Sequence, residues 1–143
     1  MSDTNAVKYE QEIPEVLQAL AGVNAVIDEQ GLDRTLHHLV QLRASQINRC
    51  AFCIKMHTRE ARQDGETNER LDRVIVWEHV NDFSEREKAA LAWTEALTVL
   101  DARTDFAALR SRLRAQFSDK EIGTLSATVA MINLWNRIQI SRH

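Results

Sequence analysis

The chain has 143 residues, of which 44% are hydrophobic and 27% charged, and this length and balance suit one globular domain with a substantial core. Its 18 Lys and Arg residues against 21 Asp and Glu residues give a formal net charge of -3, which argues against a nucleic-acid partner. No apolar run is long enough for a membrane span, and the polar start lacks the apolar centre of a signal peptide. We therefore expect a single cytoplasmic domain over residues 1–143 without a membrane partner.

The first part of the chain predicts two amphipathic helices. Apolar residues recur at spacings of three and four from residue 14 to about residue 30, with Pro14 in the first turn and Gly31 as the stop. Asp33 is placed to cap a second helix that ends near Asn48. The dozen residues before the first helix show no such period, and we expect them to be mobile or to pack on a partner chain.

Three further helices follow in the middle of the chain. The third carries both cysteines and runs to about Asp64, where Gly65 ends it. The fourth begins near Asn68. The apolar residues that it is expected to bury are Leu71, Val74, Ile75 and Trp77. Residues 84–87 read Ser-Glu-Arg-Glu, a capping box that opens a fifth helix reaching about residue 100.

The last third of the chain predicts two more helices. Thr104 or Asp105 caps the sixth, and a second capping box at residues 118–121 opens the seventh. No segment alternates at period two, and the chain contains only 4 Gly and 1 Pro. The fold class is therefore all-α, with short connections that favour a compact bundle of about six or seven helices.

The stretch from Cys50 to His57, CAFCIKMH, carries the candidate chemistry, and it contains both cysteines of the chain. Cys50, Cys53 and His57 stand at i, i+3 and i+7, so one helical face can present all three to a single pocket. A helix that begins near Cys50 would stabilise a thiolate with its unpaired amide groups and its dipole. His57 could then take the proton from Cys53, and Cys50 would be the resolving partner of an oxidised Cys53.

Two other interpretations of the cysteines remain open at this point. Buried cysteines can simply fill a helix interface. Zinc could bind two Cys, one His and a fourth ligand, but the other histidines are scattered rather than paired at a close spacing. They are His37, His38, His79 and His143. We therefore expect no metal site.

Four segments resemble the alkyl hydroperoxidase D (AhpD-like) family, which shares its all-helical fold with carboxymuconolactone decarboxylases. They are LVQLRASQIN at 39–48, CAFC at 50–53, HTREAR at 57–62 and LAWTEALT at 91–98. The resemblance covers about half of the chain, with the core motif region at about residues 31–100.

The resemblance implies a thiol peroxidase that acts on hydroperoxides as an antioxidant and needs no cofactor. In this family the second cysteine of the pair attacks the peroxide, and the first closes a disulfide that an external thiol or dithiol reduces. Carried over, Cys53 is peroxidatic, Cys50 is resolving and His57 transfers the proton. Chains with one such unit associate as trimers or hexamers, so a homo-oligomer is expected.

One position departs from the family pattern, because His38 stands where the AhpD relay has a glutamate twelve residues before the first cysteine. An imidazole has a reference pKa of about 6.5, closer to neutrality than the about 4.3 of a glutamate, so His38 could serve as an auxiliary proton acceptor or orienting group. We expect neighbouring His37 to be solvated. Trp77 and Trp93 are expected in the core or an interface rather than against substrate.

Three alternative functions follow from the same residues. The cysteine pair could belong to a disulfide oxidoreductase or redox sensor with little peroxidase turnover. The thiols could instead bind zinc in a structural module. A decarboxylase related to carboxymuconolactone decarboxylase is possible by analogy of fold, but that chemistry needs no cysteine pair.

Overall fold

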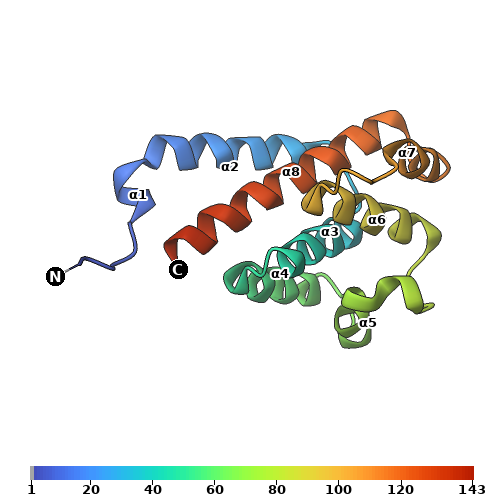
Figure 1. The fold of residues 1–143 in the computed structure, drawn as a ribbon, viewed down its shortest axis with the longest axis horizontal. Coiled ribbons are helices and arrows are strands. Elements are labelled where there is room, and N and C mark those ends of the chain that lie inside the picture. The colour runs from blue at the N-terminus through green and yellow to red at the C-terminus, as the bar shows by residue number, and fades with distance from the viewer. Residues whose placement is uncertain (1) are drawn as a thin grey trace.

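The computed structural model describes residues 2–143, and the regular elements in this range are all helical (Figure 1). In chain order they are α1 (Tyr9–Glu12), α2 (Pro14–Glu29), α3 (Arg34–Ile47), α4 (Ala51–Gln63), α5 (Asn68–Arg73), the 3-10 helix η1 (Val74–His79), α6 (Glu85–Val99), α7 (Phe106–Arg114) and α8 (Asp119–Arg142). The all-α class is confirmed, and six of the seven predicted helices correspond to α2, α3, α4, α6, α7 and α8.

Side-chain caps fix several helix starts as the sequence predicts. The Asp33 carboxylate accepts a hydrogen bond from the Thr35 N–H at the start of α3. Ser84 and Ser118 form complete capping boxes with Glu87 and Glu121 at the starts of α6 and α8. Of the two residues that could cap α7, Thr104 and Asp105, the structure shows Asp105 as the N-cap. Each cap satisfies amide groups that the helix itself leaves unpaired.

The third helix, α3, lies at the centre of the bundle and packs against α4, α6 and α8. Leu36, Leu39, Val40 and Leu42 of α3 are buried and divide between two clusters of core side chains. One cluster joins α3 to α6, α7 and α8, and the other joins it to α4, α5, η1 and α6. In Figure 1, α2 lies along α8 at the outside of this arrangement. No helix within residues 2–143 has the length and apolar content that a bilayer crossing requires.

The predicted fourth helix divides into two short elements. It continues as α5 only to Arg73, and the following 3-10 segment contains a non-helical residue, Val76 (φ -119°, ψ 27°). Because a 3-10 helix has three residues per turn, Val74 and Trp77 share its buried side, whereas Ile75 turns outward and is 61% exposed. The expectation that Ile75 is buried was therefore wrong.

A short first helix, α1, was not predicted from the sequence. The Tyr9 hydroxyl hydrogen-bonds with Ser141 Oγ at 2.8 Å, and Glu10 pairs with Arg142, both at the end of α8. Four helical residues are too few to produce a recognisable period, and their partners are 132 residues away in sequence. This segment packs within its own chain.

The connection between α3 and α4 is a Schellman turn. The Cys50 N–H donates to the Ser45 carbonyl at 3.1 Å, and the Arg49 N–H donates to the Gln46 carbonyl at 3.1 Å. Arg49 has φ 58°, the left-handed conformation that glycine usually supplies at this position and that Gly65 supplies after α4. Cys50 is thus both the last residue of the turn that ends α3 and the N-cap residue of the next helix.

Buried polar side chains of α8 brace this turn. Asn136 is fully buried; its Nδ2 donates to Ser45 Oγ at 3.0 Å and its Oδ1 accepts from Asn48 Nδ2 at 2.9 Å. Asn48 also donates to Asn133 Oδ1 at 2.9 Å, and Ser45 Oγ donates to the Gln41 carbonyl at 2.7 Å. Since buried polar groups that lose a partner are costly, the network holds the end of α3 against α8.

We predict that Asn136→Ala lowers the free energy of unfolding by about 1–3 kcal/mol, because two buried hydrogen bonds are lost. Urea denaturation followed by circular dichroism measures this change. Asn5→Ala is the matched control, since Asn5 is exposed near the amino terminus and should change stability by less than about 0.5 kcal/mol. An equal effect of the two substitutions would contradict a bracing role for Asn136.

Candidate functional site

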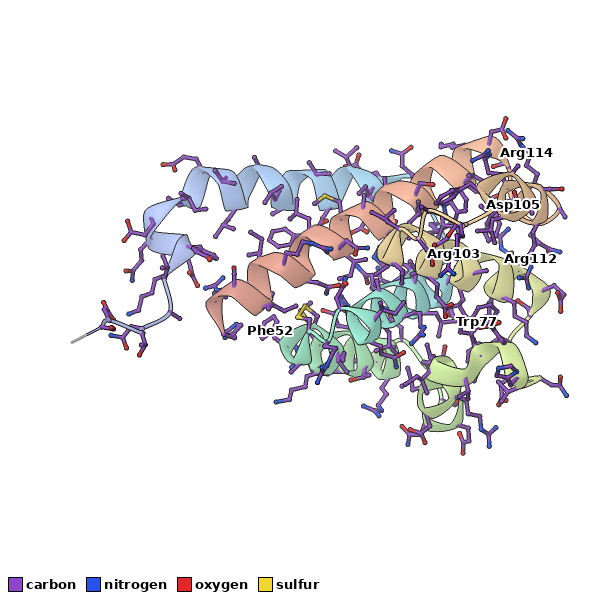
Figure 2. All side chains as sticks on the ribbon, viewed as in Figure 1. Phe52, Trp77, Arg103, Asp105, Arg112 and Arg114 are labelled. Carbon is purple, nitrogen blue, oxygen red and sulfur yellow. A yellow bond between two sulfur atoms is a disulfide. The ribbon has the colours of Figure 1, made fainter. Side chains whose placement is uncertain are left out.

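The Schellman turn places both cysteines at the start of α4. Cys50 is the N-cap residue, and its Sγ accepts a hydrogen bond from the Cys53 N–H at 3.3 Å. The two residues form a disulfide with their Cα atoms 5.3 Å apart. Each is only 1% exposed, so neither cysteine lies open on the outer surface. Figure 2 shows the disulfide beside Phe52, at the amino-terminal end of α4.

A cavity of about 500 Å³ leads to this disulfide from between α2, α3, α4 and α8. Its apolar lining consists of Ile27, Phe52, Met56, Met131, Ile132 and Trp135. Its other lining residues include Cys53, His57, His38 and His37. Cys50 is not among the described residues that line it. The structure thus brings Cys53, His57 and His38 to one cavity and leaves Cys50 outside its described lining.

His57 is buried without a hydrogen-bond partner. Its side chain lies on α4 one turn beyond Cys53, the residue is 3% exposed, and neither ring nitrogen has a partner among the described residues. The nearest carboxylate oxygen, Oε2 of Glu60, is 3.7 Å from Nδ1. Burial lowers the pKa of His57 from 6.5 to about 4, helped by the nearby His37 and His38. The ring is therefore neutral near pH 7 and has a free acceptor nitrogen.

His38, by contrast, has a strong partner. Its Nε2 lies 2.6 Å from Oδ2 of Asp64, which also accepts a hydrogen bond from Arg34 Nε at 2.9 Å. The hydrogen bonds from His38 and then Arg34 lower the pKa of Asp64, so this carboxylate is ionised. The other ring nitrogen of His38, Nδ1, is buried and has no hydrogen-bond partner in the described structure.

His37 lines the cavity too, which corrects the expectation that it is solvated. Its side chain is only 17% exposed, and Nε2 is 3.8 Å from Oδ1 of Asp28 on α2. Burial lowers the pKa of His37, and the charge of the Asp28 carboxylate offsets part of this shift. The apolar spacing of α3 places His37 beside the buried face of that helix. The side chain is buried because α2 packs over it, which the pattern of α3 alone does not show.

Several other polar and aromatic residues support the fold. Trp77 and Trp93 are buried, with their ring N–H groups donating to Glu95 at 2.6 Å and Ser126 at 3.0 Å, which confirms their place in the core. Ser45 braces the turn before Cys50, as described above. Gln46 accepts from Arg43 at 3.1 Å and is not part of the cavity lining.

Asp64 is the main site residue that sequence reasoning missed. It stands seven residues after His57, so the helical spacing that relates Cys50, Cys53 and His57 also extends to Asp64. That spacing could have pointed to Asp64 as a site residue. Its hydrogen-bond partner could not be found in the same way, because His38 lies 26 residues earlier on another helix. Phe52, which stacks on His143 with ring centroids 5.1 Å apart beside the cavity, was also missed.

The structure also bears on the zinc alternative. Both cysteine sulfurs are engaged in the disulfide. Among residues 2–143 no group of three or more His, Cys, Asp and Glu side chains is arranged to hold a metal ion.

The fold and the cavity together define an all-helical protein of the AhpD type with a cysteine pair at a helix start. The chain belongs to the carboxymuconolactone decarboxylase family, whose model matches residues 14–96. An uncharacterised protein of Bacillus subtilis, YdfG, is 33% identical over 135 residues, which are 94% of this chain and 92% of YdfG. Another uncharacterised protein, YnjA of Escherichia coli, is 31% identical over 72% of this chain and 56% of its own length.

Solved structures agree with this assignment. A protein of unknown function from Agrobacterium tumefaciens, whose description relates it to the antioxidant defence protein AhpD, superimposes with a TM-score of 0.90 at 34% identity. The match covers 97% of this chain and 95% of that one. The debrominase Bmp8 has the same fold, with a TM-score of 0.79 at 20% identity over 92% of this chain and 72% of its own.

The buried, neutral His57 predicts a pH dependence of stability. Its pKa is about 4 in the folded chain and 6.5 when unfolded, so the unfolded chain binds the extra proton between these values. The contribution of His57 to stability is therefore complete above pH 6.5 and declines as the pH falls towards 4. We predict that wild type loses about 3 kcal/mol more than His57→Gln between pH 7 and pH 4.

Urea denaturation of the two oxidised proteins at both pH values measures this difference, and titrating groups that do not interact with His57 cancel in the comparison. Equal losses in wild type and variant would mean that His57 is protonated or hydrated in the folded protein.

Proposed function

We propose that the protein is a thiol peroxidase that reduces organic hydroperoxides through the Cys53–Cys50 pair, with an external thiol or dithiol of the cytoplasm as reductant. The observation that carries the proposal is that Cys53 lines the cavity together with two buried histidines, His57 and His38, whereas Cys50 is not among the described lining residues. A substrate in the cavity meets one sulfur and two potential proton acceptors. The disulfide corresponds to the oxidised product of one turnover.

The first step would consume the peroxide. In the reduced protein a neutral histidine takes the Cys53 proton, and the Cys53 thiolate attacks the terminal oxygen of ROOH. The S–O bond forms, the O–O bond breaks, and the histidine returns the proton to the leaving RO⁻ to give ROH. Cys53 is left as a sulfenic acid. His57 is suited to this exchange because burial keeps it neutral and leaves both ring nitrogens without a protein partner.

The second step would close the disulfide and release water. Cys50 Sγ attacks the Cys53 sulfenic sulfur, and the hydroxyl leaves with the Cys50 proton. An external thiolate then attacks Cys53, the cysteine that the cavity reaches, and Cys50 departs as a thiolate. At the N-cap, Cys50 Sγ already accepts the Cys53 N–H, which favours this departure. A second external thiol releases Cys53 and completes the external disulfide.

The cavity supports an organic rather than a purely inorganic peroxide. A volume of about 500 Å³ lies within the usual range for small-molecule sites, roughly 300–1,000 Å³. Met56, Met131, Ile132 and Trp135 form an apolar wall against which an alkyl or aryl group can pack. Hydrogen peroxide would leave most of this wall without contacts, so an organic substituent contributes binding energy.

We predict that Cys53→Ser abolishes turnover of cumene hydroperoxide with dithiothreitol as reductant, because no attacking sulfur faces the cavity. Cys50→Ser should consume about one equivalent of peroxide in a burst and then recycle slowly, since no intramolecular disulfide forms. Stopped-flow measurement of peroxide loss distinguishes the two variants. Full turnover by both, or loss of the burst in Cys50→Ser with retention in Cys53→Ser, would contradict the assigned roles.

A second candidate function is a disulfide oxidoreductase or redox sensor that uses the same cysteines without appreciable peroxide turnover. The observation that favours it is the N-cap position of Cys50, where the helix stabilises a thiolate and so a reducible disulfide. Measured reduction potential and exchange rates with small disulfides separate the candidates. Fast exchange combined with a peroxide reaction no faster than that of free cysteine would favour this second function.

We further propose that the chain forms a homo-oligomer, a trimer or hexamer, through α2. Its outer face carries Val16, Val23 and Val26 at helical spacing, and these side chains are 44–56% exposed. Ile13, just before the helix, is exposed as well. An apolar stripe of this kind on a long surface helix is typical of an interface.

We predict that the double substitution Val23→Asp and Val26→Asp converts the oligomer to monomer, because charges would be buried in the interface. Size-exclusion chromatography with light scattering measures the mass. Gln18→Asp, on a different face of α2 and exposed, is the control and should retain the oligomer. A monomeric wild type, or an oligomer unaffected by the double substitution, would rule out association through this face.

A further inference from the structure

One carboxylate beside the cavity has no role in the steps given above. Asp64 lies at the C-cap of α4, outside the cavity lining, and its Oδ2 is 2.6 Å from Nε2 of His38. We propose that Asp64 is a positioning residue that holds His38 in one tautomer, with the proton on Nε2 and an acceptor at Nδ1 inside the site. The role in peroxide reduction rests on the proposed function, whereas the tautomer itself does not.

The hydrogen-bonding pattern determines which nitrogen carries the proton. Oδ2 of Asp64 also accepts from Arg34 Nε at 2.9 Å, and with two donors directed at it the carboxylate remains ionised. An ionised carboxylate has no proton to donate, so His38 Nε2 must be the donor. In a neutral ring Nδ1 is then the acceptor. That atom is buried and has no hydrogen-bond partner among the described residues, so its lone pair is not engaged by another protein group.

The three histidines near the cavity differ in their distance to a carboxylate. His38 is at hydrogen-bonding distance from Asp64, whereas His57 is 3.7 Å from Glu60 and His37 is 3.8 Å from Asp28. Neither of the longer distances is a hydrogen bond. Of the three, only His38 therefore has a carboxylate hydrogen-bonded to its ring, which fixes the tautomer and stabilises an imidazolium by direct contact during proton transfer.

The charged surroundings of His38 come from three helices. His37 and Arg34 belong to α3, His57 and Glu60 to α4, and Asp28 to α2. The residues that α8 adds to the cavity are uncharged: Thr128, Met131, Ile132, Trp135 and Gln139. No other carboxylate in the described structure is hydrogen-bonded to His38, so substitution of Asp64 removes the only anion that fixes its tautomer.

The placement of Asp64 is also rigid. A Schellman turn ends α4, with the Glu66 N–H donating to the Ala61 carbonyl at 2.9 Å and Gly65 at φ 95°. The Asp64 backbone N–H bonds to α4 carbonyls, so Asp64→Asn preserves the backbone and the size of the side chain. The amide can donate as well as accept, and it carries no charge.

The test combines histidine NMR with the reactivity of Cys53. In ¹⁵N-histidine-labelled, reduced protein at pH 7.5, His38 in the wild type should be the Nε2–H tautomer, assigned by its loss in His38→Gln. Asp64→Asn should give a mixture of tautomers. In this variant the rates of Cys53 alkylation by iodoacetamide and of Cys53 oxidation by cumene hydroperoxide should each fall at least tenfold. In other His-Asp pairs, replacing the carboxylate by an amide lowers the reaction rate by more than this. Asp101→Asn, which breaks an exposed Asp–Arg pair away from the cavity, should change none of these.

An unchanged His38 tautomer in Asp64→Asn would overturn the inference, and so would a changed tautomer with unchanged alkylation. If tautomer and alkylation both respond but wild type does not react with peroxide, the positioning role holds and the peroxidase proposal fails.

Discussion

The hydrogen bond from the Cys50 N–H to the Ser45 carbonyl is the constraint on which the site depends. It closes the turn that ends α3 and makes Cys50 the N-cap of α4, so the position of both sulfurs follows from one backbone turn. The turn requires a left-handed conformation at Arg49, which a non-glycine residue adopts at some cost. Asn136 and Asn48 offset that cost by bracing the end of α3 against α8.

Contact with the cavity and hydrogen-bond partners, rather than degree of burial, then distinguish chemically similar residues of the site. Cys50 and Cys53 are equally buried, but the cavity reaches only Cys53. His57 and His38 are equally buried as well, yet His57 has no partner and a pKa lowered to about 4, whereas His38 is bonded to an ionised carboxylate. A site of this kind uses the low polarity of its surroundings to keep one ring neutral and a fixed charge to orient the other.

The parts of the fold set by local sequence were predictable. Capping boxes at Ser84 and Ser118 and the spacing of Cys50, Cys53 and His57 act within one or two turns, and the structure confirms the helix starts that they indicate. Features that depend on distant segments were not predictable. The anchoring of α1 by Ser141, the cover of His37 by α2 and the bond between His38 and Asp64 join residues from separate helices. The change from α5 to a 3-10 helix was missed because apolar residues at a spacing of three fit either helix.

The most direct measurement is a single turnover of the reduced wild-type protein with one equivalent of cumene hydroperoxide, quenched at increasing times with dimedone and analysed by peptide mass spectrometry. We predict a dimedone adduct on Cys53 at the earliest times, giving way to the Cys50–Cys53 disulfide in proportion to the peroxide consumed. Two results would contradict a peroxidatic Cys53. One is a dimedone adduct that forms first on Cys50. The other is a protein whose two thiols are still unmodified when free cysteine would have reacted completely with the peroxide.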